Sequence, residues 1–260
     1  MKLRAKKRFI VLFGALVFLI SGIFYARAQY VVPVIMYHSI DDNAYASKLS
    51  VSPESFRRQM SFLKKHNYNV VRLEDLPGLI RRGNIPYKTI AITFDDGLEN
   101  NYTNAYPVLK ETGLPATIFI VPALTGRDEY LTWDQVIEMS GSDVVSIGSH
   151  SMTHAYLTDL AEQKLDIEIF DSKRAIESHT REKVSALSYP LGGFNDYVRD
   201  KVIKAGYAIA VGTNPGKDYP KHDIFAMKRV RISRTSDNLF VFWIETSGFY
   251  TWIKEHRDED

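Results

Sequence analysis

After Tyr30 the chain alternates short runs rich in β-branched and aromatic residues with amphipathic runs of helical period. Repeated strand–helix alternation indicates an α/β fold with a parallel sheet and helices outside it, because parallel strands need crossover connections. The predicted strands are Val31–Met36, Asn69–Arg72, Thr89–Phe94, Pro115–Val121, Asp143–Ile147, Val184–Tyr189, Tyr207–Gly212 and Ala226–Ile232. The predicted helices are Pro53–His66, Leu73–Arg82, Asn100–Thr112, Trp133–Ser140, Asp159–His179, Asp196–Lys204 and Asp237–Thr246. Seven or eight such units without a linker favour one distorted (β/α)7-8 barrel over a doubly wound open sheet.

The first 28 residues differ in composition from the rest. They begin with five basic side chains between Lys2 and Arg8, continue with an uncharged apolar run of 18 residues from Phe9 to Ala26, and contain no acid. This order is typical of a secretory signal peptide or an uncleaved signal-anchor, and the length of the run leaves both open. Residues 1–28 are therefore predicted as a signal or transmembrane segment. Residues 29–260 are predicted as one domain outside the cytoplasmic membrane, either secreted or membrane-anchored.

Charge and cysteine content exclude some classes of function. Residues 29–260 have 27 basic and 31 acidic side chains, a formal charge of −4. A nucleic-acid partner is therefore not expected, because such proteins carry a basic excess in the folded domain. The chain contains no cysteine, so it has neither disulfides nor thiolate metal ligands. Any bound metal must use histidine, carboxylate or water.

Two carboxylates directly follow a predicted buried strand. Ile90–Phe94 continues into Asp95, Asp96 and Gly97. Adjacent side chains on a strand point to opposite faces, so both carboxylates reach one site only where the strand ends and the backbone turns, which glycine permits. The carboxyl ends of barrel strands form the active-site face. An ordinary turn or helix start remains an equal alternative for this motif alone.

Two histidines follow another predicted strand at the spacing of metal ligands. After Asp143–Ile147 and two small residues come His150 and His154. If this segment turns helically, the i, i+4 pair offers two imidazole nitrogens to one ion. With Asp95 or Asp96 the pair would form a site of two histidines and one carboxylate. Zinc is the expected metal, and cobalt, nickel or iron are also compatible with these ligands.

The two motifs together resemble those of a known family. Thr93–Gly97 and Ser149–His154 resemble the first two signature motifs of the carbohydrate esterase family 4 deacetylases, the NodB-homology domain, and the similarity extends over most of the chain. This resemblance implies a barrel of the NodB-homology type. It also implies that the catalytic base is Asp95 and that the metal ligands are Asp96, His150 and His154.

The third family motif, Arg-x-Pro-Phe/Tyr-Gly, is altered to Ser188–Gly192, without the arginine. In the family this arginine helps to hold the catalytic base, so another group must orient Asp95, and the sequence does not identify it. The remaining Tyr189, Pro190 and Gly192 are candidate substrate-binding residues, because the loop backbone can bind acetate or a developing oxyanion.

A fourth motif is represented by Leu131–Asp134. By the resemblance, Trp133 would form a wall of the acetyl pocket, and Asp134 would contact the catalytic residues. An aromatic residue at an ordinary helix start, with an acid near the helix N-terminus, is an equal alternative.

The usual general acid, a histidine of a Leu-x-His motif near the C-terminus, has no counterpart here. Instead Tyr37 and His38 end the first predicted strand, at the expected catalytic face. This arrangement resembles the permuted branch that includes the poly-β-1,6-N-acetylglucosamine deacetylases, in which an N-terminal Tyr-His pair supplies the acid. The resemblance implies that His38 is the general acid, and a structural histidine at a strand end is the alternative.

The expected function is metal-dependent removal of N-acetyl groups from an extracellular or cell-wall polysaccharide, with poly-β-1,6-N-acetylglucosamine as the expected substrate. The chain is expected to act as a monomer. The alternatives are a peptidoglycan or chitin N-deacetylase, a xylan O-acetyl esterase, and a catalytically silent glycan-binding homologue that lost the third-motif arginine. A zinc peptidase is disfavoured because the chain has no His-Glu-x-x-His sequence.

Overall fold

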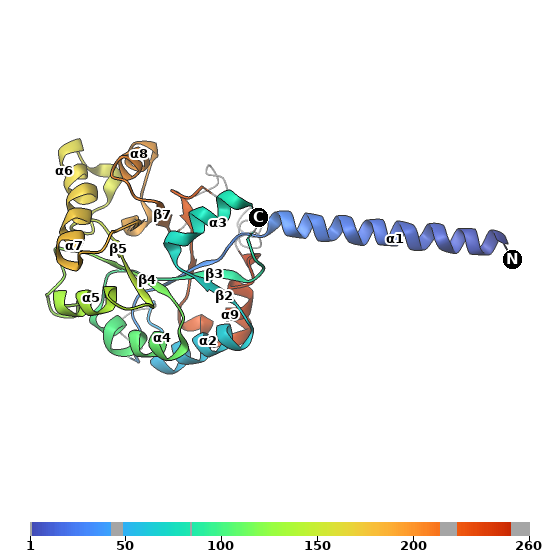
Figure 1. The fold of residues 1–260 in the computed structure, drawn as a ribbon, viewed down its shortest axis with the longest axis horizontal. Helices are drawn as coiled ribbons and strands as arrows, with labels where there is room; N and C mark the ends of the chain where they lie inside the picture. Colours follow the sequence, from blue (N-terminus) through green and yellow to red (C-terminus); the bar gives the residue numbers. More distant parts are fainter. Residues whose placement is uncertain (1, 43–48, 84, 214–222, 251–260) are drawn as a thin grey trace.

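A computed structural model describes residues 2–42, 49–83, 85–213 and 223–250, and its named strands run parallel in one sheet (Figure 1). The strands are β1 (Val34–Tyr37), β2 (Asn69–Val71), β3 (Thr89–Phe94), β4 (Ala116–Ile120), β5 (Val145–Ser149), β6 (Ala186–Ser188), β7 (Ile209–Gly212), β8 (Met227–Lys228) and β9 (Val230–Arg231). They pair in the order β8-β7-β6-β5-β4-β3-β1-β9, and β2 pairs with the first half of β3.

One short segment nearly closes the sheet into a barrel. β8 pairs with β7 at one edge, β9 pairs with β1 at the other, and only Arg229 separates β8 from β9. The two edges of the sheet are therefore joined by consecutive residues of the same segment. The prediction of a distorted (β/α) barrel is confirmed. The prediction of one strand over Ala226–Ile232 is wrong, because the segment changes its pairing partner at Arg229.

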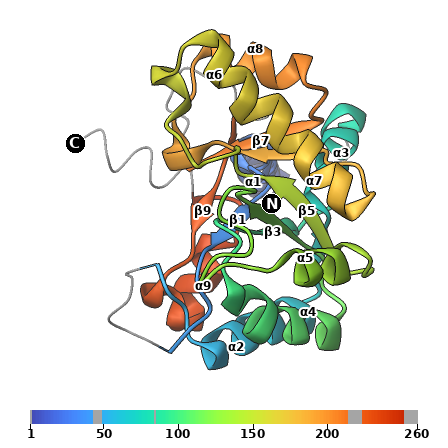
Figure 2. The ribbon, with the colours of Figure 1, turned by 90° about the vertical axis from the view of Figure 1, so that its left-hand side faces the viewer.

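Helices surround the strands (Figure 2). They are α2 (Pro53–Lys65), α3 (Leu76–Arg82), α4 (Tyr106–Thr112), α5 (Trp133–Ser140), α6 (Glu162–Asp166), α7 (Ser172–Thr180), α8 (Asp196–Lys204) and α9 (Leu239–Glu245). Two of the predicted helices contain a wider π-helical turn, at Asn101–Ala105 before α4 and at Ile167–Asp171 between α6 and α7. The first is explained by Pro107, which lacks an N–H and whose ring would clash with the carbonyl four residues earlier in a regular α-helix.

The core has an inner and an outer part. On β1 and β3, Ile35, Tyr37 and Phe94 belong to the larger cluster, which packs against the helices, whereas Val34 and Ala91 belong to a smaller cluster with Phe119. The alternation follows from the two-residue period of a strand. Gly148 on β5 is required by this packing, because a Cβ there would lie 2.4 Å from Cδ1 of Phe119. Phe119 therefore fills the barrel interior beneath the strand ends.

The N-terminal helix α1 (Lys2–Gln29) extends away from the barrel (Figure 1). The large apolar side chains described on it, between Leu12 and Tyr25, are exposed, from 43% at Ile20 to 82% at Phe18. Of the helices in the described part of the chain, none combines the length and the apolar character needed to span a membrane. The barrel begins directly after α1, where Val31 N–H donates a hydrogen bond to the carbonyl of Gly248.

Candidate active site and metal centre

Polar side chains gather at the carboxyl ends of the strands. They are His38 after β1, Asp95 and Asp96 after β3, His150 after β5 and Ser188 at the end of β6. Because all of these strands are parallel, their carboxyl ends lie on one face of the barrel. Residues separated by more than 100 positions in the sequence therefore come together there.

The backbone turns sharply after β3. Asp96 and Gly97 both adopt left-handed backbone conformations, with φ of 72° and 66°. A Cβ on Gly97 would lie 2.9 Å from Cγ2 and 3.2 Å from Cα of Ile120, so this position requires glycine. The turn separates the two carboxylates: the side chain of Asp95 stays buried at 4% exposure, and that of Asp96 is 29% exposed. The strand ends and the backbone turns at this point, as the sequence predicts for a motif whose two carboxylates reach one site.

Asp96, His150 and His154 converge as a potential metal site. Oδ1 of Asp96 lies 3.6 Å from Nε2 of His150 and 3.5 Å from Nε2 of His154. The candidate ligand atoms all lie within 4.8 Å of one another. Ligands of a tetrahedral zinc ion, at about 2.0–2.1 Å from the metal, are roughly 3.3 Å apart. The spacing and the donor types therefore fit a divalent metal ion.

The environment of His150 favours metal binding. Its Nδ1 lies 2.8 Å from the carbonyl oxygen of Ser188, to which it donates a hydrogen bond, and this leaves Nε2 as the ligand atom. Burial, the largest effect, lowers the pKa of His150, although the carboxylates of Asp95 and Asp96 oppose it. The imidazole is therefore held in the neutral form that binds metals.

The segment from His150 to His154 is not helical, so the prediction of a helical i, i+4 pair is wrong. Ser151 and His154 have left-handed φ values of 62° and 64°. The N–H of His154 donates to Oγ of Ser151 at 3.0 Å, which closes a tight loop. The two imidazoles meet because this loop folds back, and a regular helix would not contain such residues.

Glu168 fixes this loop from the π-helical turn between α6 and α7. Its two carboxylate oxygens accept hydrogen bonds from the N–H and Oγ1 of Thr153, at 2.9 and 2.6 Å. The side chain of Glu168 is buried and Thr153 adjoins His154. Glu168 therefore restrains the backbone that presents the third ligand.

Arg229 binds the carboxylate of Asp95 with two hydrogen bonds. Nη1 donates to Oδ1 at 2.7 Å and Nη2 donates to Oδ2 at 2.6 Å. Nη2 also donates to Oγ of Ser188 at 2.9 Å, and Nη1 to Oγ1 of Thr93 at 3.2 Å. Arg229 thus performs the holding role that the third-motif arginine has in the family, from a different strand segment.

This arrangement determines the protonation state of Asp95. Burial by itself would raise the pKa of the carboxyl group, but the charge and hydrogen bonds of Arg229 outweigh it and hold the pKa well below its usual range. Asp95 is therefore ionised and able to accept a proton. Its position 3.8 Å from Nε2 of His150 places it beside the metal ligands.

His38 lies at the same end of the barrel, partly buried. Burial, the largest effect, lowers its pKa, and the charges of Asp95 and Asp96 raise it. Tyr37 on β1 pairs with Phe94 on β3, so His38 and Asp95 leave neighbouring strands side by side. Its Nδ1 is buried without a hydrogen-bond partner among the described residues. The structure therefore brings the candidate acid to the candidate base and metal ligands.

Comparison with known proteins identifies the family. A family profile described as Polysaccharide deacetylase matches residues 82–210. YxkH of Bacillus subtilis, which bears the name of a polysaccharide deacetylase, is 33% identical over 217 residues, covering 83% of this chain and 76% of its own length. The chain belongs to the polysaccharide deacetylase family. The deacetylase is accordingly a hydrolase, and it acts on an N-acetylated polysaccharide, usually with the help of a metal in this family.

Two further proteins are similar to the deacetylase. The structure of Streptococcus pyogenes deacetylase PplD in complex with acetate matches with a TM-score of 0.74 and 27% identity, over 81% of this chain and 97% of that one. The poly-β-1,6-N-acetyl-D-glucosamine N-deacetylase of Staphylococcus aureus strain MRSA252 is 24% identical over 197 residues, which is 71% of this chain and 68% of its own.

The altered third motif of the deacetylase lies largely in the core. Tyr189 is fully buried, stacks on Phe194 with centroids 4.4 Å apart and donates its hydroxyl to the carbonyl of Phe225. Pro190 is also buried, whereas Gly192 is partly exposed and has φ of 74°. The loop backbone is bonded within the protein, since Tyr189 N–H donates to the carbonyl of Val211 and Gly192 N–H donates to the carbonyl of Tyr189.

Trp133 and Asp134 lie at the start of α5, apart from the metal ligands. The indole ring of Trp133 stacks on His179 of α7, with centroids 3.8 Å apart and planes at 9°. Thr132 caps the helix by accepting a hydrogen bond from Gln135 N–H, and Asp134 is exposed in the first turn. This geometry matches the alternative of an ordinary helix start, and within the described residues no hydrogen bond or ion pair joins either side chain to Asp95 or His38.

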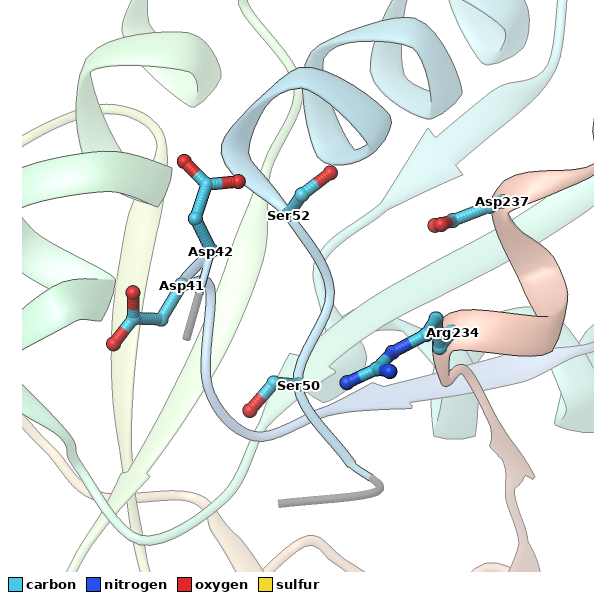
Figure 3. Close-up of a pocket in the computed structure, with 6 residues that line it drawn as sticks. All are labelled: Asp41, Asp42, Ser50, Ser52, Arg234 and Asp237. Atoms are coloured by element: carbon cyan, nitrogen blue, oxygen red, sulfur yellow. The ribbon is translucent and has the colours of Figure 1, made fainter. Parts of the chain in front are cut away.

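A polar pocket lies near the carboxyl ends of β1 and β9 of the deacetylase (Figure 3). It has a volume of about 190 Å³ and lies between the loop after β1 and the turn after β9. Its lining residues are Asp41, Asp42, Ser50, Ser52, Arg234 and Asp237. Three carboxylates, two hydroxyls and a guanidinium make this a surface suited to hydrogen bonding with a hydroxyl-rich ligand.

Arg229 is the functional residue that the sequence analysis missed. The predicted strand Ala226–Ile232 also contains Lys228 and Arg231, so the sequence does not single out Arg229 as the buried cation. The side chain of Arg229 has 0% exposure, and a buried charge of this kind must be paired. Its partner is the carboxylate of Asp95.

Proposed function

We propose that this deacetylase removes N-acetyl groups from poly-β-1,6-N-acetylglucosamine with a zinc ion held by Asp96, His150 and His154. The observation that carries the proposal is the place of His38, which follows the first strand β1 beside Asp95 at the end of the neighbouring strand β3. An acid in this position is expected of the branch that acts on this polymer. The Staphylococcus aureus relative named for the same substrate gives further support.

In the proposed reaction the residues divide the proton transfers between them. When bound, a divalent ion polarises a carbonyl oxygen and lowers the pKa of water. Asp95, kept ionised and oriented by Arg229, accepts the proton of the attacking water. His38 gives a proton to the departing amine nitrogen. Amines leave poorly from amides without a proton, and general acid–base steps each contribute roughly 10²–10⁴ to the rate.

Acetate release from a panel of polymers tests the substrate. The purified full chain, loaded with zinc, is assayed on poly-β-1,6-N-acetylglucosamine, chitin oligomers, peptidoglycan fragments and acetylated xylan, with and without a chelator. We expect the β-1,6-linked polymer to be the best substrate and the chelator to abolish turnover. His150→Ala, prepared in the same way, is the control for contaminating activity. Faster release from any of the other three polymers would overturn the substrate assignment.

Peptidoglycan, chitin and xylan remain the competing substrates, since the same metal centre serves all of them. The polar pocket between the loop after β1 and the turn after β9 gives no reason to prefer a particular linkage. The alternative of a silent glycan-binding homologue rested on the missing third-motif arginine, and Arg229 now supplies the same contact to Asp95. That reason for a silent homologue no longer holds.

We also propose that the barrel works outside the cytoplasmic membrane, as a monomer. Residues 1–28 would deliver it there as a cleaved signal or hold it there as an anchor. The order of basic residues, apolar run and Ala26-Arg27-Ala28 supports the location outside the membrane. N-terminal sequencing of the protein recovered from cells, with membrane fractionation, distinguishes the two cases. A chain found intact in the cytoplasm contradicts both.

A further inference from the structure

The loop that carries His38 is held by asparagine side chains from a distant part of the sequence. Nδ2 of Asn101 donates a hydrogen bond to the carbonyl oxygen of His38 at 2.7 Å. Nδ2 of Asn104 donates to the carbonyl oxygen of Ile40 at 2.8 Å. Both bonds reach the backbone of the loop directly after β1, so they determine where the loop leaves the strand.

Asn100 adds two bonds to the same loop. Its Nδ2 donates to Oγ of Ser39 at 2.8 Å, and its Oδ1 accepts from the N–H of Ile40 at 3.1 Å. We call Asn100, Asn101 and Asn104 the asparagine clamp. The clamp contacts three consecutive residues, from His38 to Ile40, and leaves that stretch little freedom to move.

A π-helical turn shapes the clamp. The N–H of Tyr106 donates to the carbonyl of Asn101, five residues earlier, which widens the turn that contains Asn101 and Asn104. Pro107 accounts for this wider turn, as described above. Such turns occur often at functional sites in proteins. Here the turn follows the Asp95–Gly97 segment closely, so one stretch of chain supplies both the base and the contacts to the acid's loop.

Asn101 is an unfavourable choice for packing alone. The residue is fully buried, and its Oδ1 has no hydrogen-bond partner among the described residues. An unpaired buried acceptor destabilises a fold, and an apolar side chain of similar size would avoid this. The bond from Nδ2 to His38 is what the asparagine supplies and an apolar residue cannot.

His38 depends on such backbone support. Its Nδ1 makes no hydrogen bond within the described residues, so no carboxylate orients the ring through that atom. The direction of the imidazole is then set by the backbone from which it projects. We infer that the asparagine clamp, with Asn101 as its central member, positions His38 to protonate the leaving amine. This inference rests on the proposed role of His38.

Two substrates with different leaving groups test the inference. An N-acetylglucosamine oligomer releases an amine and needs the acid, whereas p-nitrophenyl acetate releases a stabilised phenolate and does not. The full chain with zinc is compared with Asn101→Ala and with Asn101→Leu, which keeps the volume and removes the donor. We expect kcat on the oligomer to fall about 10- to 100-fold, part of the roughly 10²–10⁴ contributed by an acid, with KM, zinc content and ester hydrolysis retained.

Two controls make the outcome specific. Thr103→Ala changes an exposed residue in the same turn and should leave both reactions unchanged. His38→Gln should show the same split between amide and ester as the Asn101 variants, and if it does not, the acid role of His38 fails. If His38→Gln shows the split but folded Asn101→Leu does not, the clamp is only structural. Should both Asn101 variants fail to fold, Asn104→Ala provides the same comparison, and an unchanged ratio of amide to ester turnover overturns the inference.

Discussion

The guanidinium of Arg229 and the carboxylate of Asp95 form a buried two-point ion pair, with N–O distances of 2.7 and 2.6 Å. Arg229 is the residue at which the closing segment passes from β8 to β9. Arg229 therefore lies at the seam of the barrel and also orients the base. Its loss should change how activity depends on pH.

Replacing Arg229 by methionine should raise the pKa of Asp95, because its largest favourable charge is removed while burial remains. A base loses activity as the pH falls through its pKa, so the acid limb of the rate profile should move to higher pH. We expect kcat to fall about 10- to 100-fold, less than complete loss of the base. Removing one partner of a buried pair also destabilises the fold, by roughly 3–5 kcal/mol. The pH–rate profile of acetate release and thermal unfolding measure the two effects.

A double variant separates the effect of Arg229 on the orientation of Asp95 from its effect on the stability of the fold. Ser188 occupies the position of the usual third-motif arginine, and its Oγ already accepts a bond from Arg229. The double variant Ser188→Arg with Arg229→Ser should recover part of the lost activity and return the acid limb towards low pH. If Arg229→Met is stable and has the wild-type profile, Arg229 does not tune the base.

The metal ligands and the base should respond differently to substitution. Asp95→Asn should retain zinc and lose turnover by roughly 10²–10⁴, the contribution of a general base. His150→Ala should lose both zinc and activity, because it removes a buried ligand whose orientation is fixed by Ser188. Metal content of the purified proteins and acetate release are the measurements. Full activity of metal-loaded Asp95→Asn would remove Asp95 as the base.

Glu168 should control metal affinity without touching the metal. Glu168→Ala removes both hydrogen bonds to Thr153 and so releases the loop that leads to His154. Loss of a residue that supports a metal ligand typically lowers metal affinity by about 10–100-fold. Glu168→Gln keeps an acceptor for the Thr153 N–H and should lose less. Competition with a fluorescent chelator measures the affinities of the three proteins. Equal zinc affinity in Glu168→Ala and wild type contradicts the role.

The sequence predicts those parts of the site that depend on strand ends. Asp95, Asp96 and His150 follow apolar strands, and a parallel barrel places such residues on one face whatever the details of its closure. His154 lies close to Asp96 and His150, but a folded-back loop and not a helical turn brings it there. Two left-handed residues form its loop, and such conformations depend on contacts like that of Glu168, which lies 14 positions later in the chain.

The seam could not be predicted from local pattern. Met227–Arg231 has the composition of one short strand, and its division depends on which strands lie at the two edges. The place of Arg229 follows from this division, since a side chain at that point projects into the barrel interior over the ring of Phe119. Long-range strand pairing therefore determines which residue orients the base, namely Arg229, whereas the local sequence around Asp95 identifies the base itself.

Glu245, at the end of α9, should make stability depend on pH outside the active site. It is 5% exposed, and its Oε2 has no hydrogen-bond partner among the described residues. Burial raises the pKa of Glu245 from 4.5 to about 7. Between these values the folded protein holds a proton that the unfolded chain has released. The free energy of unfolding should therefore fall as the pH rises through this window.

Glu245→Gln should flatten this dependence, because the amide fills the same space and does not ionise. Urea unfolding at pH 5 and pH 8 compares the variant with the wild type and with Glu182→Gln, which alters an exposed carboxylate. We expect the wild type and Glu182→Gln to lose stability between the two pH values and Glu245→Gln to lose less. A parallel decline in all three proteins would mean that Glu245 is already ionised in the fold. The buried carboxylate would then need a hydrogen-bond donor or a cation to stabilise its charge.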